Sequence, residues 1–167
     1  MKVNKKYVIA GAIGVVSIAA ALAYLQYKKL MNYVIKVYKA NVNNLTINNL
    51  NFNLLLNFTN NSNIGFTIEK QIINAYINEK FVAKIENNVP SVIKPNSTSI
   101  ININVDLNPS KVLGLLSTNI TNILLRPETV RIKLDIKLRV KLWFFRVNLP
   151  FVFDKTLKEI KDMKKEK

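Results

Sequence analysis

A strict two-residue alternation between residues 130 and 144 constrains the fold of this chain more than any other feature. Every even-numbered residue in this stretch is apolar, and every odd-numbered residue except Trp143 is charged. Because successive side chains of a β-strand point to opposite faces, the pattern predicts one long strand with one buried face. A helix would distribute the same apolar side chains all round its axis.

Shorter alternating segments predict that the rest of the chain folds in the same way. Clusters of Asn, Pro and Ser, which favour turns, separate these segments. One segment differs, because residues 110–126 place apolar side chains at helical spacing between two prolines. We therefore expect an all-β fold, an immunoglobulin- or fibronectin-III-like antiparallel β-sandwich with one inserted helix. The other expected strands cover residues 34–42, 51–58, 72–77, 81–85, 101–107 and 147–153.

The N-terminal segment differs in character from the rest of the chain. Residues 7–25 carry no charge and are flanked by lysines, and as a helix they would span roughly 28 Å, close to the ~30 Å core of a bilayer. This predicts a single N-terminal transmembrane helix, although Ala21-Leu22-Ala23 also resembles the cleavage site of a signal peptide. The expected placement is a single-pass membrane protein whose domain lies on the non-cytoplasmic side of a cell membrane, or in the membrane of a virus particle.

This reading divides the chain into an anchor with basic flanks (1–29), a β-sandwich (30–154) and a Lys-rich charged tail (155–167). Within the anchor, small residues at spacings of four, three and four would share one helix face and allow close helix packing. An alanine-rich span can also produce such a stripe by chance. The stripe consists of Ala10, Gly14, Ser17 and Ala21.

The composition argues against an enzyme. The chain has no Cys and no His, so thiolate metal sites, thiol nucleophiles and the commonest general base near neutral pH are excluded. Its 10 acidic residues form no tight cluster, and its 4 glycines form no phosphate-binding loop. We therefore predict no catalytic residues, no metal and no cofactor.

The charged face of the long predicted strand is the main candidate binding site. Alternate residues of a strand lie roughly 6.7 Å apart, so its basic side chains form a row. Such a row could bind anionic lipid headgroups, at about 1 kcal/mol per basic residue. It could also be a solvated face whose lysines protect a sheet edge from pairing. Nucleic acid is disfavoured, because the row lacks interleaved aromatic side chains before Trp143. The row contains Arg131, Lys133, Lys137, Arg139 and Lys141, with Asp135 as its only acid.

The order of several motifs between residues 34 and 153 resembles the late embryogenesis abundant type 2 family, also called the water-stress and hypersensitive-response (WHy) domain. A strand enters an Asn-Pro-Asn-like turn at 60–63, where Asn61 stands in place of the proline. A hairpin follows at 72–85, and then a Pro-then-Ser/Thr approach to the next strand at 92–99. The final strand begins with Leu149-Pro150-Phe151. The resemblance implies an immunoglobulin-like sandwich, a form with a membrane anchor, and non-enzymatic roles at membrane surfaces.

Together these features predict a non-enzymatic, membrane-anchored binding or structural module that acts at a membrane surface. Its expected partners are the lipid bilayer, including anionic headgroups, and protein partners such as further copies of the chain. One alternative is a structural membrane protein of a virus, phage or envelope assembly. A weaker alternative is a lipid carrier that uses the interior of the sandwich.

Overall fold

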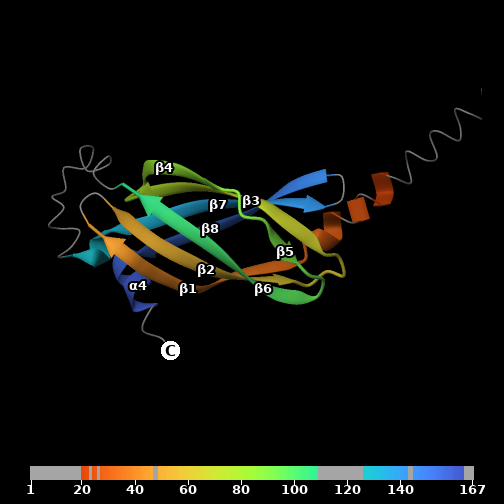
Figure 1. The fold of residues 1–167 in the computed structure, drawn as a ribbon, viewed down its shortest axis with the longest axis horizontal. Helices are drawn as coiled ribbons and strands as arrows, with labels where there is room; N and C mark the ends of the chain where they lie inside the picture. Colours follow the sequence, from red (N-terminus) through yellow and green to blue (C-terminus); the bar gives the residue numbers. More distant parts are fainter. Residues whose placement is uncertain are drawn as a thin grey trace, which may run out of the picture.

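Eight antiparallel strands form two sheets that pack against each other (Figure 1). The computed structural model describes residues 20–163 except 23, 26, 47–48, 109–125 and 143–144. Sheet A has the order β1-β2-β6, and sheet B has the order β4-β3-β7-β8 with β5 also paired to β3. The strands are β1 Tyr33–Leu45, β2 Leu50–Asn60, β3 Phe66–Ile77, β4 Lys80–Asn87, β5 Ser91–Ile93, β6 Ser97–Leu107, β7 Arg131–Leu142 and β8 Phe145–Thr156.

One hydrophobic core fills the space between the two sheets. In β2 and β7, buried residues alternate regularly with more exposed ones, as period-two patterning requires. At one end of the core, Phe58 is fully buried. Its ring stacks on Tyr33 at 5.5 Å between centroids and meets the edge of Phe66 at 5.6 Å. The alternation seen in the sequence therefore separates an inner and an outer face on each of these strands.

The strand predicted at residues 130–144 is confirmed as β7, and it is an interior strand of sheet B. It pairs with β3 on one side and with β8 on the other along nearly its whole length. Its even-numbered residues belong to the core, including Leu134 and Leu138, which have no exposed surface. Since β7 is not an edge strand, its lysines do not protect a sheet edge.

The all-β prediction is confirmed, with local differences. β3 begins at Phe66, six residues before the predicted start, and the short strand β5 was not predicted. The inserted helix expected at 110–126 lies almost entirely outside the described residues, which resume with Arg126 and the 3-10 turn η1, Pro127–Thr129. The strand order shows two antiparallel sheets, and the immunoglobulin-like part of the prediction is not confirmed.

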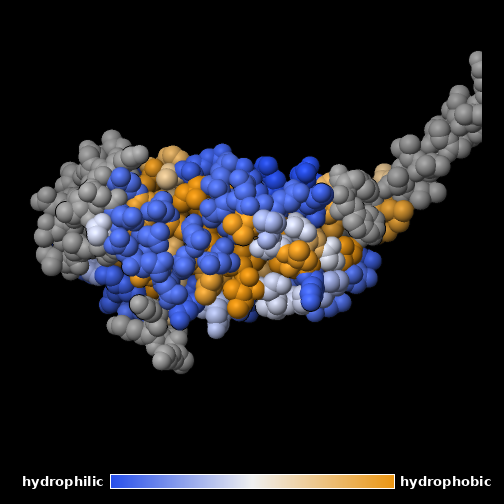
Figure 2. Space-filling model, viewed as in Figure 1, coloured by the Kyte–Doolittle hydropathy of each residue, from blue (hydrophilic) through white to orange (hydrophobic). Residues whose placement is uncertain are grey.

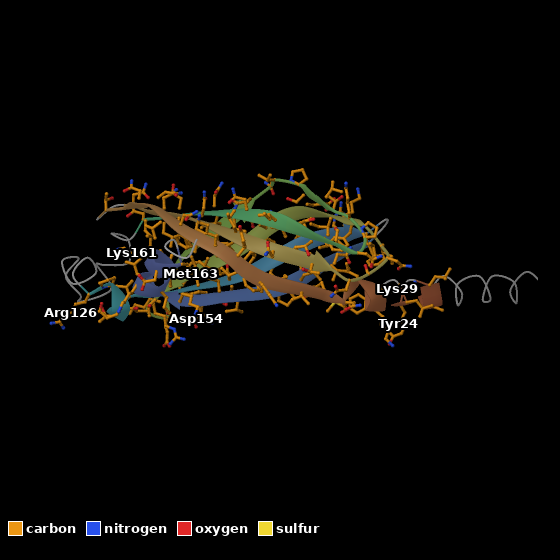
Figure 3. All side chains as sticks on the ribbon, turned by 90° about the horizontal axis from the view of Figure 1, so that it is seen from below. Tyr24, Lys29, Arg126, Asp154, Lys161 and Met163 are labelled. Atoms are coloured by element: carbon orange, nitrogen blue, oxygen red, sulfur yellow. The ribbon has the colours of Figure 1, made fainter. Side chains whose placement is uncertain are left out.

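The prediction of a single-pass membrane protein is contradicted by the structure. Among the described residues, no helix combines the length and the apolar character that crossing a bilayer requires. Most of the predicted span, residues 7–19, lies outside the described residues, and the described helical residues between 20 and 30 end at Leu30, which is buried in the core. Tyr24 and Lys29 lie at one end of the molecule, and Asp154 and Lys161 lie toward the other (Figure 3).

The C-terminal segment packs on the sandwich beyond the predicted boundary at residue 154. β8 continues to Thr156, and helix α4, Leu157–Asp162, follows at once. Thr156 and Glu159 form a reciprocal capping box: the Thr156 hydroxyl accepts from the Glu159 amide at 3.2 Å, and the Glu159 carboxylate accepts from the Thr156 amide at 2.8 Å. Leu157 and Ile160 are fully buried, so part of the predicted tail belongs to the folded domain.

A buried asparagine organises the turn after β2. Asn60 has no exposed surface. Its amide nitrogen donates to the carbonyl oxygens of Ile64 at 2.8 Å and Lys94 at 3.0 Å. Its side-chain oxygen accepts from the backbone amide of Ser62 at 3.0 Å and from the Ser62 hydroxyl at 2.7 Å. All four hydrogen-bonding positions of the amide are therefore used, and they join the turn before β3 to the turn before β6.

Candidate functional site

The predicted basic row lies on the outer face of sheet B, where β7 runs between β3 and β8. Its odd-numbered residues alternate with the buried core residues of the same strand. We call the outer surface of β4, β3, β7 and β8 the cationic face. Its basic residues outnumber its acids, which are Glu69, Glu86, Asp135 and Asp154. The basic residues are Lys70, Lys84, Arg131, Lys133, Lys137, Arg139, Lys141 and Arg146.

Most of these basic side chains contact a carboxylate. Arg131 makes two parallel hydrogen bonds with Asp154, from Nε to Oδ1 at 2.6 Å and from Nη2 to Oδ2 at 2.9 Å. Near the other end of β7, Glu69 pairs with Arg146 at 2.8 Å and lies 3.9 Å from Lys141. These ion pairs neutralise the Arg131 end of the row and partly neutralise the other end, where Glu69 is shared by two cations.

Two further clusters of contacts on the face involve Lys133 and Glu86. The Lys133 ammonium lies 3.6 Å from the Asp135 carboxylate and 5.5 Å from the centre of the Tyr76 ring. On the outer strand β4, the Glu86 carboxylate contacts Lys70 and pairs with Lys84 at 2.8 Å. Glu86, like Glu69, is thus shared by two cations, whereas the two basic residues in the middle of β7 have no such partner among the described residues.

Lys137 and Arg139 make no ion pair with any residue that the structure describes. Lys137 lies between Ile72 of β3 and Pro150 of β8 in the strand register. Arg139 lies between Lys70 and Asn148. The residues opposite these two cations in the register are thus apolar, neutral or basic. The Arg139 charge also helps to lower the pKa of Glu69 without an ion pair, and Asp135 lies two residues before Lys137 on the same strand. Because neither cation is held in an ion pair with a described residue, both can contact an anion.

The electrostatics of the face agree with this geometry. The hydrogen bond from Arg146 lowers the pKa of Glu69, and that from Arg131 lowers the pKa of Asp154. Hydrogen bonds from Lys70 and then Lys84 lower the pKa of Glu86 to about 2. These acids stay ionised in neutral solution, so the ion pairs persist there and the excess of cations is permanent.

The pKa of Glu86 can be measured to test this arrangement. In a carbon-detected NMR titration, we expect the Glu86 carboxyl to titrate with a midpoint of about 2. Replacement of Lys70 and Lys84 by Met removes both donors, so the midpoint should return toward about 4.3. Lys36→Met/Lys94→Met, which removes two lysines that make no ion pair with described residues, should leave it unchanged. A normal Glu86 midpoint in the unmodified protein would contradict the pairing.

A shallow hollow of about 340 Å³ lies on the face where β3 turns into β4. Tyr76, Glu79, Arg131 and Lys133 line it together with Asp135 and Asp154. The described residues contain no group of three His, Cys, Asp or Glu side chains arranged to hold a metal ion. The arrangement can hold charged groups by ion pairing, and it places no activated nucleophile beside a base.

Sequence reasoning located the basic row and missed the acids that pair with its ends. Asp135 is on the same strand and was visible, whereas Glu69 and Asp154 come from neighbouring strands. Only the strand register brings these partners to β7. Of the predicted helix-packing stripe, Ala21 is described as an exposed helical residue, and Ala10, Gly14 and Ser17 lie outside the described residues.

Comparisons with known proteins agree with the motif order noted in the sequence. The fold is similar to a crystal structure of a protein from Archaeoglobus fulgidus, with a TM-score of 0.56 and 19% identity over 73% of this chain and 92% of that one. It is also similar to the solution structure of a "putative late embryogenesis abundant (LEA) protein", with a TM-score of 0.55 and 14% identity over 92% and 88% of the two chains. A third similar structure, of a protein from Arabidopsis thaliana, has a TM-score of 0.52 and 12% identity over 73% and 80%.

None of the curated proteins matches this sequence. At these identities the structural similarity shows the fold alone. A family model described as late embryogenesis abundant protein matches residues 55–153, more than half of the chain. That match runs from the middle of β2, through the Asn60 turn and β7, to Phe153 in β8. Because the match covers more than half of the chain, the chain belongs to the LEA_2 family.

Proposed function

We propose that this protein is a non-enzymatic binding module that docks on anionic membrane surfaces through the cationic face of sheet B. Membership of the LEA_2 family favours a module without enzymatic activity. The observation that carries the proposal is the pair of unneutralised cations, Lys137 and Arg139, in the middle of an interior strand. Neither forms an ion pair with a described residue, and β7 has no edge that would need protection.

The shape and composition of the face support a planar anionic partner. The sheet presents its cations at strand spacing, so several headgroups can be contacted at once. An exposed apolar side chain also lies on this face: Val152 is 55% exposed on β8, opposite Asp135 in the register. Basic residues near an anionic bilayer contribute about 1 kcal/mol each, and short apolar side chains between them can contact the interfacial region.

Binding to phospholipid vesicles tests the proposal. The purified full-length chain should bind phosphatidylcholine vesicles that contain phosphatidylserine more tightly than pure phosphatidylcholine vesicles. Lys137→Glu/Arg139→Glu should weaken this additional binding by at least about 30-fold, because two cations are removed at about 1 kcal/mol each and two repulsive charges are added. Sedimentation of the vesicles measures both affinities.

A matched control separates a specific face from general charge. Lys36→Glu/Lys94→Glu makes the same change in net charge at two exposed positions outside the cationic face, and it should weaken binding only several-fold. Added salt should weaken binding of the unmodified protein, since exposed charges are screened within about 10 Å at 0.1 M ionic strength. Equal losses for both double variants would refute a role for the cationic face.

The two alternative functions receive no comparable support from the described residues. A lipid carrier needs an apolar cavity, whereas the hollow on the cationic face is lined mostly by charged side chains. A structural role in a virus particle or envelope assembly would require a surface for protein partners, and no observation singles one out.

A further inference from the structure

A second site lies at the seam of the sandwich, where β4 of sheet B approaches β6 of sheet A. These are edge strands of the two sheets on the same side of the molecule. A groove of about 310 Å³ runs between them. Figure 2 shows that hydrophilic residues cover most of one face of the molecule, with smaller apolar patches among them. The groove differs from the cationic face in that its lining is mainly uncharged amides.

The floor of the groove is a fixed network of amide hydrogen bonds. Gln71 is only 1% exposed, and its Nε2 donates to the backbone oxygen of Asn102 at 3.2 Å. Asn87 donates from Nδ2 to the Gln71 side-chain oxygen at 3.2 Å and to the backbone oxygen of Asn104 at 3.3 Å. Because this network already holds the amides in place, a ligand would not have to order them on binding.

Several polar groups remain available at the walls of the groove. Both hydrogens of the Asn87 amide nitrogen are used, which leaves its side-chain oxygen as an acceptor. The side chains of Asn88 and Asn104 are exposed and make no hydrogen bond with the described residues. Each amide offers two donor hydrogens and one acceptor oxygen. The groove therefore presents donors and acceptors together, which is the pattern that hydroxyl groups match.

The charges around the groove disfavour an ionic ligand. Glu86 is its one charged lining residue and no described cation lines it, so an anion would find no oppositely charged partner unless it displaced Glu86 from Lys70 and Lys84. Lys70 and Lys84 already hold the same carboxylate, so a cation would have to displace them. Val89, 64% exposed at the rim, adds an apolar surface suited to C–H groups.

We propose that the groove between β4 and β6 binds a neutral polyhydroxylated ligand, a sugar or polyol. The amides bind its hydroxyl groups, Glu86 accepts from one of them, and Val89 contacts its carbon skeleton. The groove shares Glu86 with the cationic face, but Lys137 and Arg139, on which the proposed docking rests, do not line it. Either site can be tested without the other.

Titration of the isotope-labelled full-length chain with maltose, followed by amide NMR shifts, tests the site. We expect saturable shifts centred on residues 71, 86–89, 102 and 104, with a dissociation constant of about 1–10 mM, typical of a few hydrogen bonds on a small ligand. Asn88→Ala/Asn104→Ala should weaken binding at least about 5-fold, the effect of losing one net hydrogen bond. Glucuronate, an anionic sugar acid, should bind more weakly than glucose.

The control variant is Asn41→Ala/Asn53→Ala. These two residues face each other in the register of β1 and β2 and do not line the groove, so maltose affinity should be unchanged. Shifts that grow linearly with maltose without saturating would overturn the proposal. Equal affinity in both double variants, or shifts centred on Lys137 and Arg139, would also overturn it.

Discussion

Asn60→Asp should destabilise the fold by about 2–4 kcal/mol at neutral pH, although it replaces one nitrogen by one oxygen. The Asn60 amide nitrogen donates to two backbone oxygens, Ile64 O and Lys94 O. An ionised carboxylate has no hydrogen to donate, so its oxygen would face two carbonyl oxygens without solvent. Leaving buried acceptors unpaired beside a buried charge is among the most costly changes in a protein.

The loss should depend on pH in a defined direction. Burial and the two facing carbonyls raise the folded-state pKa of the new carboxyl above its unfolded value of about 3.9. Below that unfolded value the group is protonated in both states, and a carboxylic acid can still donate one hydrogen bond. As the pH rises from the unfolded-state pKa through the raised folded-state pKa, the free energy of unfolding falls, because the unfolded state loses its proton more readily than the folded state. The destabilisation should therefore be smallest in acid.

Urea unfolding at a series of pH values measures this effect against the unmodified protein. Asn61→Asp is the matched control, since it makes the same chemical change one residue later at an exposed side chain. It should change stability by no more than about 0.5 kcal/mol. Similar losses for the two variants, or a loss at Asn60 that is independent of pH, would contradict the hydrogen-bond assignment.

Phe58→Ala should cost about 3–5 kcal/mol, the range for removing a fully buried aromatic side chain. Phe58 has no exposed surface. Its ring stacks on Tyr33 and also meets Phe66 edge to face. Its removal leaves a cavity where β1, β2 and β3 meet. For a domain that is stable by about 5–15 kcal/mol, this is a large fraction of the total. Urea or thermal unfolding of the variant and the unmodified protein measures this loss of stability.

Phe81→Ala provides the comparison for an aromatic pair at the surface. Phe81 meets the edge of Tyr76 with ring centroids 5.7 Å apart, but it is 55% exposed. We expect its loss to cost about 1 kcal/mol, because half of its surface is already in water and only the ring pair is removed. If Phe58→Ala proved as stable as Phe81→Ala, or more stable, the three-ring cluster would not be what stabilises this end of the core.

The sequence was sufficient to predict the strands whose two faces differ most in polarity. β7 is the clearest example, since every second side chain is apolar and only one backbone conformation places them on one side. β5 was not predicted, because three residues are too few to show a period. β3 was predicted too short, since Glu69 and Lys70 interrupt its alternation where a register shift lies between Ile68 and Lys70.

The candidate sites depended more heavily on tertiary structure. The basic row was visible as a pattern within one strand, but the ion pairs at both ends required partners from β3 and β8. The role of Asn60 was hidden in a chain rich in asparagine, where one more Asn in a turn carries little information. The groove combines β3, β4 and β6, which are brought together only when the two sheets pack.

The position of β7 inside sheet B has a consequence for how such a surface can evolve. The strand carries its core residues at even positions and its surface charges at odd positions. The even positions stabilise the core and the odd positions set the charge of the surface, although both belong to one segment of sequence. A new side chain at position 137 or 139 lies on the outer face of the sheet, so it does not disturb Leu134 or Leu138 on the other side of the backbone. Mutational effects that share no contacts tend to add. The charge pattern of this strand can therefore change while the same scaffold is retained.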